Sequence, residues 1–440
     1  MLEKRLKDAL SKRSTAREVT VESDGKHVNL FGWVHEVRDL GKLVFILFRD
    51  VTGICQVVFR RDEVGESVRK ALDELSNESA VYVHGVVVKQ PKSRLGVEVF
   101  GEKLEILSKA VPKLDYDPTG KVSASLDVRL RHRILDLRKP EVRNIFIIAS
   151  SVLKALRDLF ISRGFIEVRT PKIIASATEG GAELFEVKYF DRKAYLAQSP
   201  QLYKEQLTTV FEKVFEIGPF FRAEESHTRR HISEFTSVDI EQAFADMDDV
   251  MQTLEEAIVY VYQHVIQHNQ KELNELGLTL RVPKTPFTRL SYDQAVEMLR
   301  KDGVEIRWGE DFGTLHLKAL AKHFHSYYFI TGFPTDLKPF YIQPSSDNPA
   351  VSESFDLMYQ WLELASGGTR ISDPLLLRKR LAEKGLDPNS FEDHLKVFNY
   401  GMPVHAGWGL GFERLLMVLT RRTNIREVIL FPRDKFRLTP

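Results

Sequence analysis

Residues 220–244 have the sequence FFRAEESHTRRHISEFTSVDIEQAF, and the prediction of the fold begins with this segment. Two apolar, strand-like runs flank a segment dense in charge, and this pattern predicts a β-hairpin with a cationic tip. Because side chains repeat every two residues along a strand, Arg222 and Glu224 share one face. Taken alone, the charged segment is explained equally well as a solvated turn.

Two further segments carry related signals. In HAGWGLGFERLLMVL, residues 405–419, glycines alternate along a strand-like run that leads into an apolar helix carrying Arg414. Glycine at every second position leaves one strand face bare, so a flat ring can lie against the backbone under an arginine, although tight strand-to-helix packing also explains the pattern. In SRGFIEVRTPKI, residues 162–173, a helix end precedes a strand that closes on Pro171.

The N-terminal part of the chain has a different pattern. Short β-branched and aromatic runs between Val28 and Leu107 predict about five strands, interrupted by one helix near 64–75, as in an oligonucleotide-binding (OB-fold) barrel. VPKLDYDPTGK, residues 111–121, predicts a hinge. Apolar residues between Ile145 and Phe160 then recur at helical spacing up to Gly164, and the irregular mixture of strands and helices beyond predicts a mainly antiparallel sheet flanked by helices.

Composition excludes several classes of protein. The 440 residues carry a formal charge of +1, so any nucleic-acid binding must use local patches. The one cysteine, Cys55, lies in an apolar run and is interpreted as core. The sequence lacks both common phosphate-loop motifs, a secretory h-region and a membrane-length apolar run, which leaves the cytoplasm as the expected compartment. The basic N-terminus could suggest an organellar transit peptide, but its acidic residues are unusual for one.

Taken in order, the three segments match motifs 1, 2 and 3 of the class II aminoacyl-tRNA synthetases. Pro171 matches motif 1, and motif 3 is met by the alternating glycines and Arg414; motif 2 is met by Arg222, Glu224, His231 and Phe235. TEGGAELF, QSPQLYKE, ELASGGTR and NIREVILFPRDKFRL resemble the aspartyl branch, and the compact length resembles its archaeal and eukaryotic members. The resemblance implies an α+β protein with an OB-fold anticodon-binding domain at 1–108, a hinge at 109–135 and a class II catalytic domain at 136–440.

The resemblance implies activation of L-aspartate by ATP, with Mg²⁺, and transfer to tRNA. Arg222 would contact the α-phosphate as the first catalytic candidate, with Arg414 across the bent nucleotide as the second. The implied ATP-binding residues are Arg222, Glu224, Arg230, His231, Phe235, Glu363 and Arg414. Glu363 and Ser366 would hold the metal, because magnesium prefers hard oxygen ligands.

For the amino acid, the aspartyl pattern supplies two cations, Lys204 and Arg370, for the side-chain carboxylate. Three polar residues would meet the α-ammonium group, namely Gln201, Asp239 and Glu179, the last in a glycine-containing loop expected to close over the substrate. The implied anticodon-binding residues are His35, Arg38, Phe45, Gln56, Lys92, Arg94 and Glu98. The implied partners are tRNA-Asp, with tRNA-Asn left open, and a second copy of the chain contacting near Pro171.

Two other functions stay open. Asparaginyl-tRNA synthetases share the motifs and the barrel, but Lys204 and Arg370 in their aspartyl contexts argue against one. A synthetase-like RNA-binding or regulatory protein without catalysis would not need Arg222, Glu363 and Arg414 together. A biosynthetic paralogue that makes asparagine would lack the barrel.

Overall fold

The computed structural model describes residues 4–93, 95–175, 184–225 and 228–440. The chain divides into two compact units, Met1–Lys139 and Pro140–Pro440. The stretch 109–135, predicted as a hinge, contains the short helix α3 (Leu126–Arg131) and the start of α4 (Arg133–Asp136), and both lie in the first unit.

The first unit contains a closed five-stranded barrel in the order β1-β2-β3-β5-β4, as the N-terminal pattern predicted. The predicted helix near 64–75 is also confirmed, as α2. The elements that precede α3 are α1 (Lys4–Ser11), the 3-10 turns η1 (Ala16–Glu18) and η2 (Val21–Ser23), β1 (His27–Asp39), β2 (Leu43–Arg49), β3 (Ile54–Arg60), α2 (Glu66–Glu74), β4 (Ala80–Lys89) and β5 (Val97–Ser108).

The barrel interior follows from the alternation of side chains along each strand. Val44, Ile46 and Phe48 on β2 point inward and are buried, so Phe45 between them points outward. Cys55 on β3 is also inside, and burial raises the pKa of its thiol to about 12. The thiol therefore stays protonated and unreactive, which confirms its interpretation as core.

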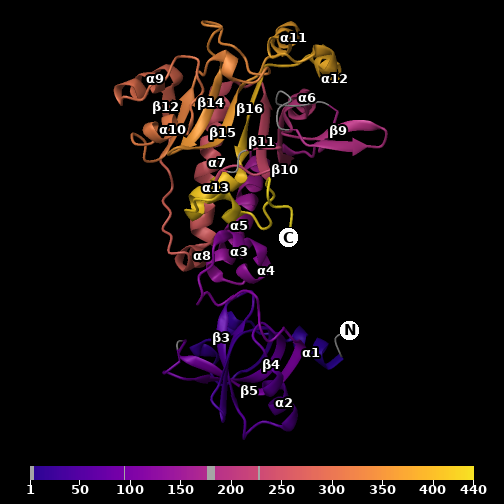
Figure 1. The fold of residues 1–440 in the computed structure, drawn as a ribbon, viewed down its shortest axis with the longest axis vertical. Helices are drawn as coiled ribbons and strands as arrows, with labels where there is room; N and C mark the ends of the chain where they lie inside the picture. Colours follow the sequence, from indigo (N-terminus) through magenta and orange to yellow (C-terminus); the bar gives the residue numbers. More distant parts are fainter. Residues whose placement is uncertain (1–3, 94, 176–183, 226–227) are drawn as a thin grey trace. The chain divides into compact units, whose positions relative to one another are not determined.

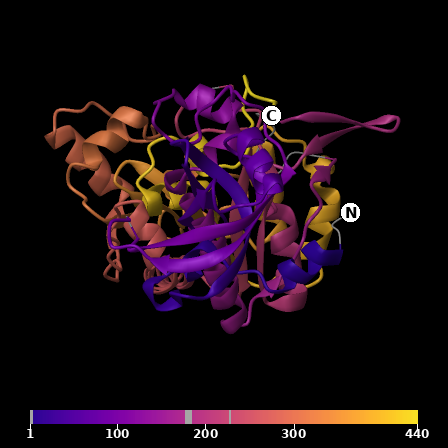
Figure 2. The ribbon, with the colours of Figure 1, turned by 90° about the horizontal axis from the view of Figure 1, so that it is seen from below.

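The second unit is built on an eight-stranded sheet in the order β12-β13-β14-β15-β16-β11-β10-β6. The pairs β6–β10 and β12–β13 are parallel and the pairs between them are antiparallel, so the predicted mainly antiparallel sheet is confirmed. A small sheet β7-β9-β8 stands beside it, and its β8–β9 hairpin projects outward (Figures 1 and 2). The strands are β6 (Ile166–Glu167), β7 (Ile173–Ile174), β8 (Glu186–Tyr189), β9 (Arg192–Leu196), β10 (Lys213–Phe221), β11 (Glu234–Ala243), β12 (Thr288–Ser291), β13 (Tyr327–Thr331), β14 (Ser354–Tyr359), β15 (Leu362–Thr369) and β16 (His405–Gly411).

Helices flank this sheet, and the two longest, α5 and α7, pack against one of its faces (Figure 1). None of the helices among the described residues combines the length and apolar character needed to cross a membrane. The helices are α5 (Pro140–Ser162), α6 (Gln201–Phe211), α7 (Met247–His268), α8 (Gln270–Glu275), α9 (Tyr292–Lys301), α10 (Thr314–Leu320), η3 (Thr335–Leu337), α11 (Pro374–Glu383), η4 (Pro388–Phe391), α12 (Glu392–Phe398), α13 (Phe412–Thr420) and η5 (Ile425–Val428).

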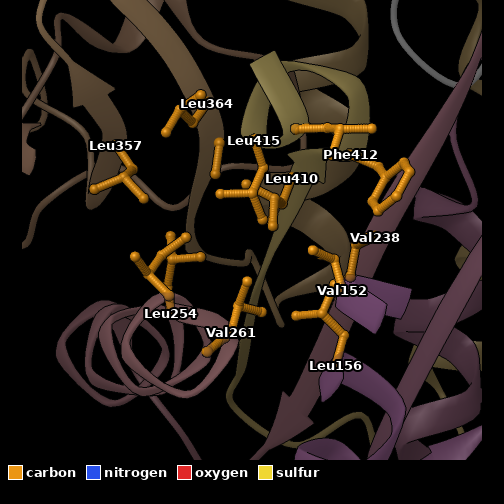
Figure 3. Packing of buried hydrophobic residues seen from close by; sticks show 14 of the residues in the cluster. Val152, Leu156, Val238, Leu254, Val261, Leu357, Leu364, Leu410, Phe412 and Leu415 are labelled. Atoms are coloured by element: carbon orange, nitrogen blue, oxygen red, sulfur yellow. The ribbon is translucent and has the colours of Figure 1, made fainter. Parts of the chain in front are cut away.

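The core of the second unit lies between the sheet and these two helices. Val152 and Leu156 of α5 and Leu254 and Val261 of α7 face strand residues such as Leu410 (Figure 3). The apolar residues that recur at helical spacing between 145 and 160 therefore form the buried face of α5. Trp408 belongs to this core and donates from Nε1 to the Val250 carbonyl of α7 at 3.0 Å. The alternating glycines of β16 consequently face the other side of the sheet.

Candidate active site

A cavity of about 420 Å³ lies in the second unit, lined by the β10–β11 hairpin, α6, β15, β16 and the start of α13. It brings together residues that are far apart in the sequence. The predicted site residues that line it are Gln201, Arg222, Glu224, Arg230, His231, Phe235, Asp239, Glu363, Ser366, Arg370 and Arg414. Glu179 and Arg94 lie outside the described residues, and Pro171 is exposed after β6.

One end of the cavity is strongly cationic. Arg222 follows the end of β10, Arg230 comes from the hairpin, and Arg414 comes from the first turn of α13. Burial lowers the pKa of Arg230, and repulsion by the Arg414 guanidinium lowers it further. Burial also lowers the pKa of His231, with smaller contributions in the same direction from all three arginines, while Glu224 opposes them. The concentrated positive charge at this end of the cavity favours binding of a polyanion and opposes binding of further cations.

The arginines are held in place by defined contacts. Arg414 donates from Nη1 to the Glu363 backbone carbonyl at 2.8 Å, and Arg230 donates from Nη2 to Thr314 Oγ1 at 2.9 Å. The Arg230 guanidinium also lies 4.8 Å from the centre of the Trp361 ring. The Arg222 guanidinium lies 5.5 Å from the centre of the Phe235 ring, so an aromatic face sits beside the cationic end.

The glycines of β16 differ in which atoms occupy the space where a side chain would otherwise lie. The three atoms nearest to a Cβ on Gly411 would all belong to Arg414, the first at an ordinary contact distance of 3.5 Å, so there the bare face lies under the arginine, as predicted. A Cβ on Gly407 would lie 2.2 Å from the Glu241 Oε2 atom, and one on Gly409 would lie 3.1 Å from Asp239 Oδ1. The space beside Gly407 is therefore already taken by a buried carboxylate, which the sequence pattern did not indicate.

Oxygen ligands gather along one wall of the cavity. Glu363 and Ser366 on β15 line it, and Asp356 on β14 is paired with Ser366 in register. Burial raises the pKa of Asp356, and the nearby Glu363 adds to this, although the Lys338 ammonium 2.7 Å from Oδ1 opposes it. Two carboxylates and a hydroxyl are the hard donors that Mg²⁺ takes, so this set fits the metal that the sequence implied.

At the other end of the cavity lies a buried network of ion pairs, of which Asp239 and Arg370 line the cavity while Lys204 and Glu241 lie behind them. Lys204 of α6 donates from Nζ to Asp239 Oδ1 at 3.0 Å and lies 3.3 Å from Glu241 Oε2. Arg370 donates from Nε to Glu241 Oε1 at 2.9 Å and from Nη2 to Oε2 at 3.3 Å. Burial alone would lower the pKa of Arg370, but Glu241 outweighs it and the pKa is raised. Both cations are thus present and held within hydrogen-bond range of carboxylates.

A second buried network lies behind this end. Gln201, the first residue of α6, donates from Nε2 to Glu205 Oε1 at 2.5 Å. Glu205 is fully buried, and its Oε2 atom lies 3.4 Å from His394 Nε2 and 3.9 Å from His405 Nε2. Burial opposes ionisation, but the two neighbouring histidines lower the pKa of Glu205, and Glu205 in turn raises the pKa of His405.

The predicted anticodon residues lie on the barrel and only some come together. Arg38 is paired with Phe45 in register, and Gln56 of β3 donates from Nε2 to Glu98 Oε1 of β5 at 2.6 Å. These four side chains share the outer face of β1, β2, β3 and β5. His35 is not among them: it is 8% exposed at a shift in the β1 register, 3.5 Å from Glu78. Lys92 is exposed in the β4–β5 turn.

Several residues of the site were missed by the sequence analysis. Glu241 follows Asp239 by two residues on β11 and so shares its strand face, a period-two signal that was available. Glu413, beside Arg414, also lines the cavity, and burial raises its pKa to about 7. The remaining missed residues had no local signal and are Lys338, Tyr341, Asp356, Glu205, His394 and His405.

Two family descriptions match the chain. Residues 125–435 match "tRNA synthetases class II (D, K and N)". Residues 28–107 match "OB-fold nucleic acid binding domain", within the tRNA anticodon family. The first match covers the whole cavity and the second covers the barrel.

Similar proteins span nearly the whole chain. The chain is 50% identical over 432 residues to the aspartate–tRNA(Asp) ligase of Pyrococcus horikoshii, covering 97% of this chain and 99% of that protein. It is 48% identical over 424 residues to the aspartate–tRNA(Asp/Asn) ligase of Archaeoglobus fulgidus, covering 96% and 99%. Among solved structures, asparaginyl-tRNA synthetase from Pyrococcus horikoshii with asparaginyl-adenylate superposes with a TM-score of 0.91 at 35% identity, covering 97% and 99%.

Proposed function

We infer the activity of this chain from its family, because it belongs to the class II tRNA synthetases of the D, K and N group. Within that group it is an archaeal-type aspartate–tRNA ligase, which activates L-aspartate with ATP and transfers it to tRNA-Asp. The observation that carries this conclusion is one cavity that joins a cationic end to an end lined by Arg370 and Asp239, with the buried Lys204 paired to Asp239 directly behind it. The aspartate ligases compared are 48–50% identical to the chain, against 35% for the asparaginyl enzyme.

The first step joins two anions. The α-carboxylate oxygen of aspartate attacks the α-phosphorus of ATP, a new P–O bond forms, and the bond from that phosphorus to the bridging oxygen breaks as pyrophosphate leaves. The nucleophile is already ionised at neutral pH, so no general base is needed. The contribution of the protein is therefore positioning and fixed positive charge.

The cationic end supplies that charge. In the proposed arrangement, Arg222 contacts the α-phosphate, Arg230 and His231 lie toward the γ-phosphate, and Arg414 crosses the bent nucleotide. The pKa values of Arg230 and His231 are lowered first by burial and then by the neighbouring arginines, and a polyphosphate would stabilise the charged form of both groups. Adenine would stack on Phe235, with its amino group at Glu224.

Magnesium fits the acidic wall of the cavity. We propose Glu363 and Ser366 as ligands, as the sequence implied, and add Asp356, whose carboxylate is paired with Ser366 across the sheet. When bound, Mg²⁺ would neutralise phosphate charge. Lys338 holds the Asp356 carboxylate in place.

Aspartate would be selected at the other end. We propose that Lys204 and Arg370 face its side-chain carboxylate, while Asp239, Gln201 and Glu179 meet its α-ammonium group. Both cations are already in contact with Glu241, so their positions are fixed before the substrate arrives. An asparagine amide would place its NH₂ donors against these cationic donors without neutralising them, which opposes binding.

The barrel would bind the anticodon through the shared outer face described above. Phe45 offers a ring on which an unstacked base can lie, and Gln56 offers an amide that can read a base edge. Arg38 and Glu98 flank them, and we propose that His35, Lys92 and Arg94 meet the neighbouring nucleotide. We also propose that the chain forms a homodimer with Pro171 near its interface. We expect it in the cytoplasm, where tRNA is charged for translation.

One experiment tests the function directly. The purified chain is given ATP, Mg²⁺ and either aspartate or asparagine, and ATP–pyrophosphate exchange is measured, followed by charging of tRNA-Asp and tRNA-Asn transcripts in parallel. We expect exchange with aspartate and charging of tRNA-Asp, and charging of tRNA-Asn as well would make the enzyme non-discriminating. Preference for asparagine would establish the asparaginyl alternative, and no exchange with either amino acid would favour a binding protein without catalysis.

A further inference from the structure

Three side chains with metal-ligating atoms meet on the outside of the barrel, and none of them is among the residues proposed to bind the anticodon. They are His27 at the start of β1, His84 on β4 and Glu102 on β5. Glu102 Oε2 lies 3.7 Å from His27 Nδ1 and 3.5 Å from His84 Nε2. All three ligand atoms lie within 4.8 Å of one another. Ligands bound tetrahedrally at about 2.1 Å from a zinc ion are roughly 3.4 Å apart, close to the two distances from Glu102 Oε2.

Backbone geometry brings Glu102 to this position. His84 is paired with Lys103, but the next residue, Gly85, is paired with Gly101. The register therefore shifts there, and Glu102 is the extra residue on β5. Such an irregularity re-aims one side chain out of the regular alternation. Here it turns the carboxylate of Glu102 toward two imidazoles.

The proton on His84 is fixed by a neighbouring amide. Asn29 donates from Nδ2 to the Lys12 carbonyl at 3.3 Å, which orients its Oδ1 atom toward Tyr82 and His84. Oδ1 accepts from the Tyr82 hydroxyl at 2.9 Å and lies 3.0 Å from His84 Nδ1. Because an amide oxygen can only accept, Nδ1 carries the proton, which leaves Nε2, 3.5 Å from Glu102 Oε2, as the ring atom available to a metal ion.

We propose that His27, His84 and Glu102 bind a divalent transition-metal cation of the zinc class, with Asn29 as the partner that orients His84. Two imidazoles and one carboxylate suit zinc, cobalt or nickel and do not suit magnesium, which keeps to oxygen ligands. The side chains of His27 and Glu102 are 60% and 48% exposed, so the ion would be reachable from solvent. The site is separate from the aminoacylation residues and does not depend on the proposed function.

The test uses the full chain, stripped of metal and titrated with zinc chloride by calorimetry and with Co²⁺ by visible absorption. We expect one equivalent bound by the wild type that His84→Ala removes, without loss of aspartate-dependent exchange. Asn29→Ala should weaken this binding by about 10- to 100-fold, the usual effect of losing the partner that orients a ligand. His264→Ala is the matched control, because His264 stacks on His268 on α7 at 4.2 Å between ring centres and has no part in the proposed site.

Two outcomes would overturn the proposal. One is the absence of a bound equivalent in the wild type, which would leave the three residues as a salt bridge to a protonated histidine. The other is equal binding by the wild type and His84→Ala, which would place the metal elsewhere on the chain. Circular dichroism of each variant shows whether the barrel remains folded, and Glu102→Gln offers a second, milder removal of one ligand.

Discussion

Removing the carboxylate of Glu205 is predicted to weaken aspartate binding without weakening ATP binding. Glu205 is fully buried and accepts from Gln201, which lines the cavity, while His394 and His405 flank its other oxygen. In Glu205→Ala the Gln201 amide loses its partner, and a buried donor left unsatisfied costs about 1 to 3 kcal/mol. A positioning group displaced by about 1 Å lowers the rate by on the order of 100-fold. Glu205→Gln keeps an acceptor for Gln201 and should restore most of the loss.

The measurement is aspartate-dependent ATP–pyrophosphate exchange, with aspartate and ATP titrated separately. We expect the KM for aspartate to rise strongly in Glu205→Ala and weakly in Glu205→Gln, with the KM for ATP unchanged in both. Thr209→Ala on the same helix is the control, because the Thr209 hydroxyl bonds only to the local Gln206 carbonyl at 2.7 Å. If a folded Glu205→Ala variant kept the KM for aspartate, or raised both KM values equally, Glu205 would have no positioning role.

The same variants test the electrostatics of the network. The pKa of His405 is raised in the folded state, so its stabilising contribution is present below the unfolded value of 6.5 and is lost as pH rises through the folded value. The pKa of Glu205 is lowered, so its contribution is present above 4.5 and is lost as pH falls through the folded value. Glu205→Gln should remove both dependences. The measurement is the thermal unfolding midpoint of the wild type and of Glu205→Gln across these two pH ranges. If the midpoints of both proteins changed with pH in parallel, the charges would not interact.

Three further predictions concern other parts of the chain. Arg222→Gln should lower the rate of adenylate formation by about 100- to 1000-fold with little change in the KM for aspartate, and a single-turnover assay would contradict this if only ATP binding changed. The Glu413 pKa of about 7 lies above its ordinary 4.5, so the free energy of unfolding should fall by about 3 kcal/mol as pH rises between these values. In Glu413→Gln, unfolding midpoints measured at pH 5 and 8 should no longer show this fall, and the same difference between the two midpoints as in the wild type would refute the prediction. Phe45→Ala should weaken charging of tRNA by about 1 to 3 kcal/mol of stacking free energy while leaving ATP–pyrophosphate exchange intact, and loss of both would point to misfolding.

The sequence predicted elements whose residues are close together along the chain. The β10–β11 hairpin, the barrel strands and the buried stripe of α5 each follow from a local period, and the structure confirms them. Contacts between side chains on different strands or helices had no such periodic signal in the sequence. His394 contacts Glu205 from a different helix, and Asp356 meets Ser366 only because β14 and β15 pair in one register. A shift of one residue would turn the Asp356 side chain to the opposite face, and the sequence alone does not fix that register.

The glycines of β16 show why a correct local pattern led to an incomplete interpretation. Alternating glycines do leave one face of the strand bare, but what occupies the space depends on the neighbouring strand. On β11, Glu241 is paired with Gly407 and Asp239 with Gly409, so each missing side chain lies beside a carboxylate. Because a Cβ at Gly407 would overlap the Glu241 carboxylate, that glycine allows Glu241 to lie between Lys204 and Arg370. The same three-glycine pattern therefore serves both ends of the cavity, making room for the carboxylates at one end and for the reach of Arg414 at the other.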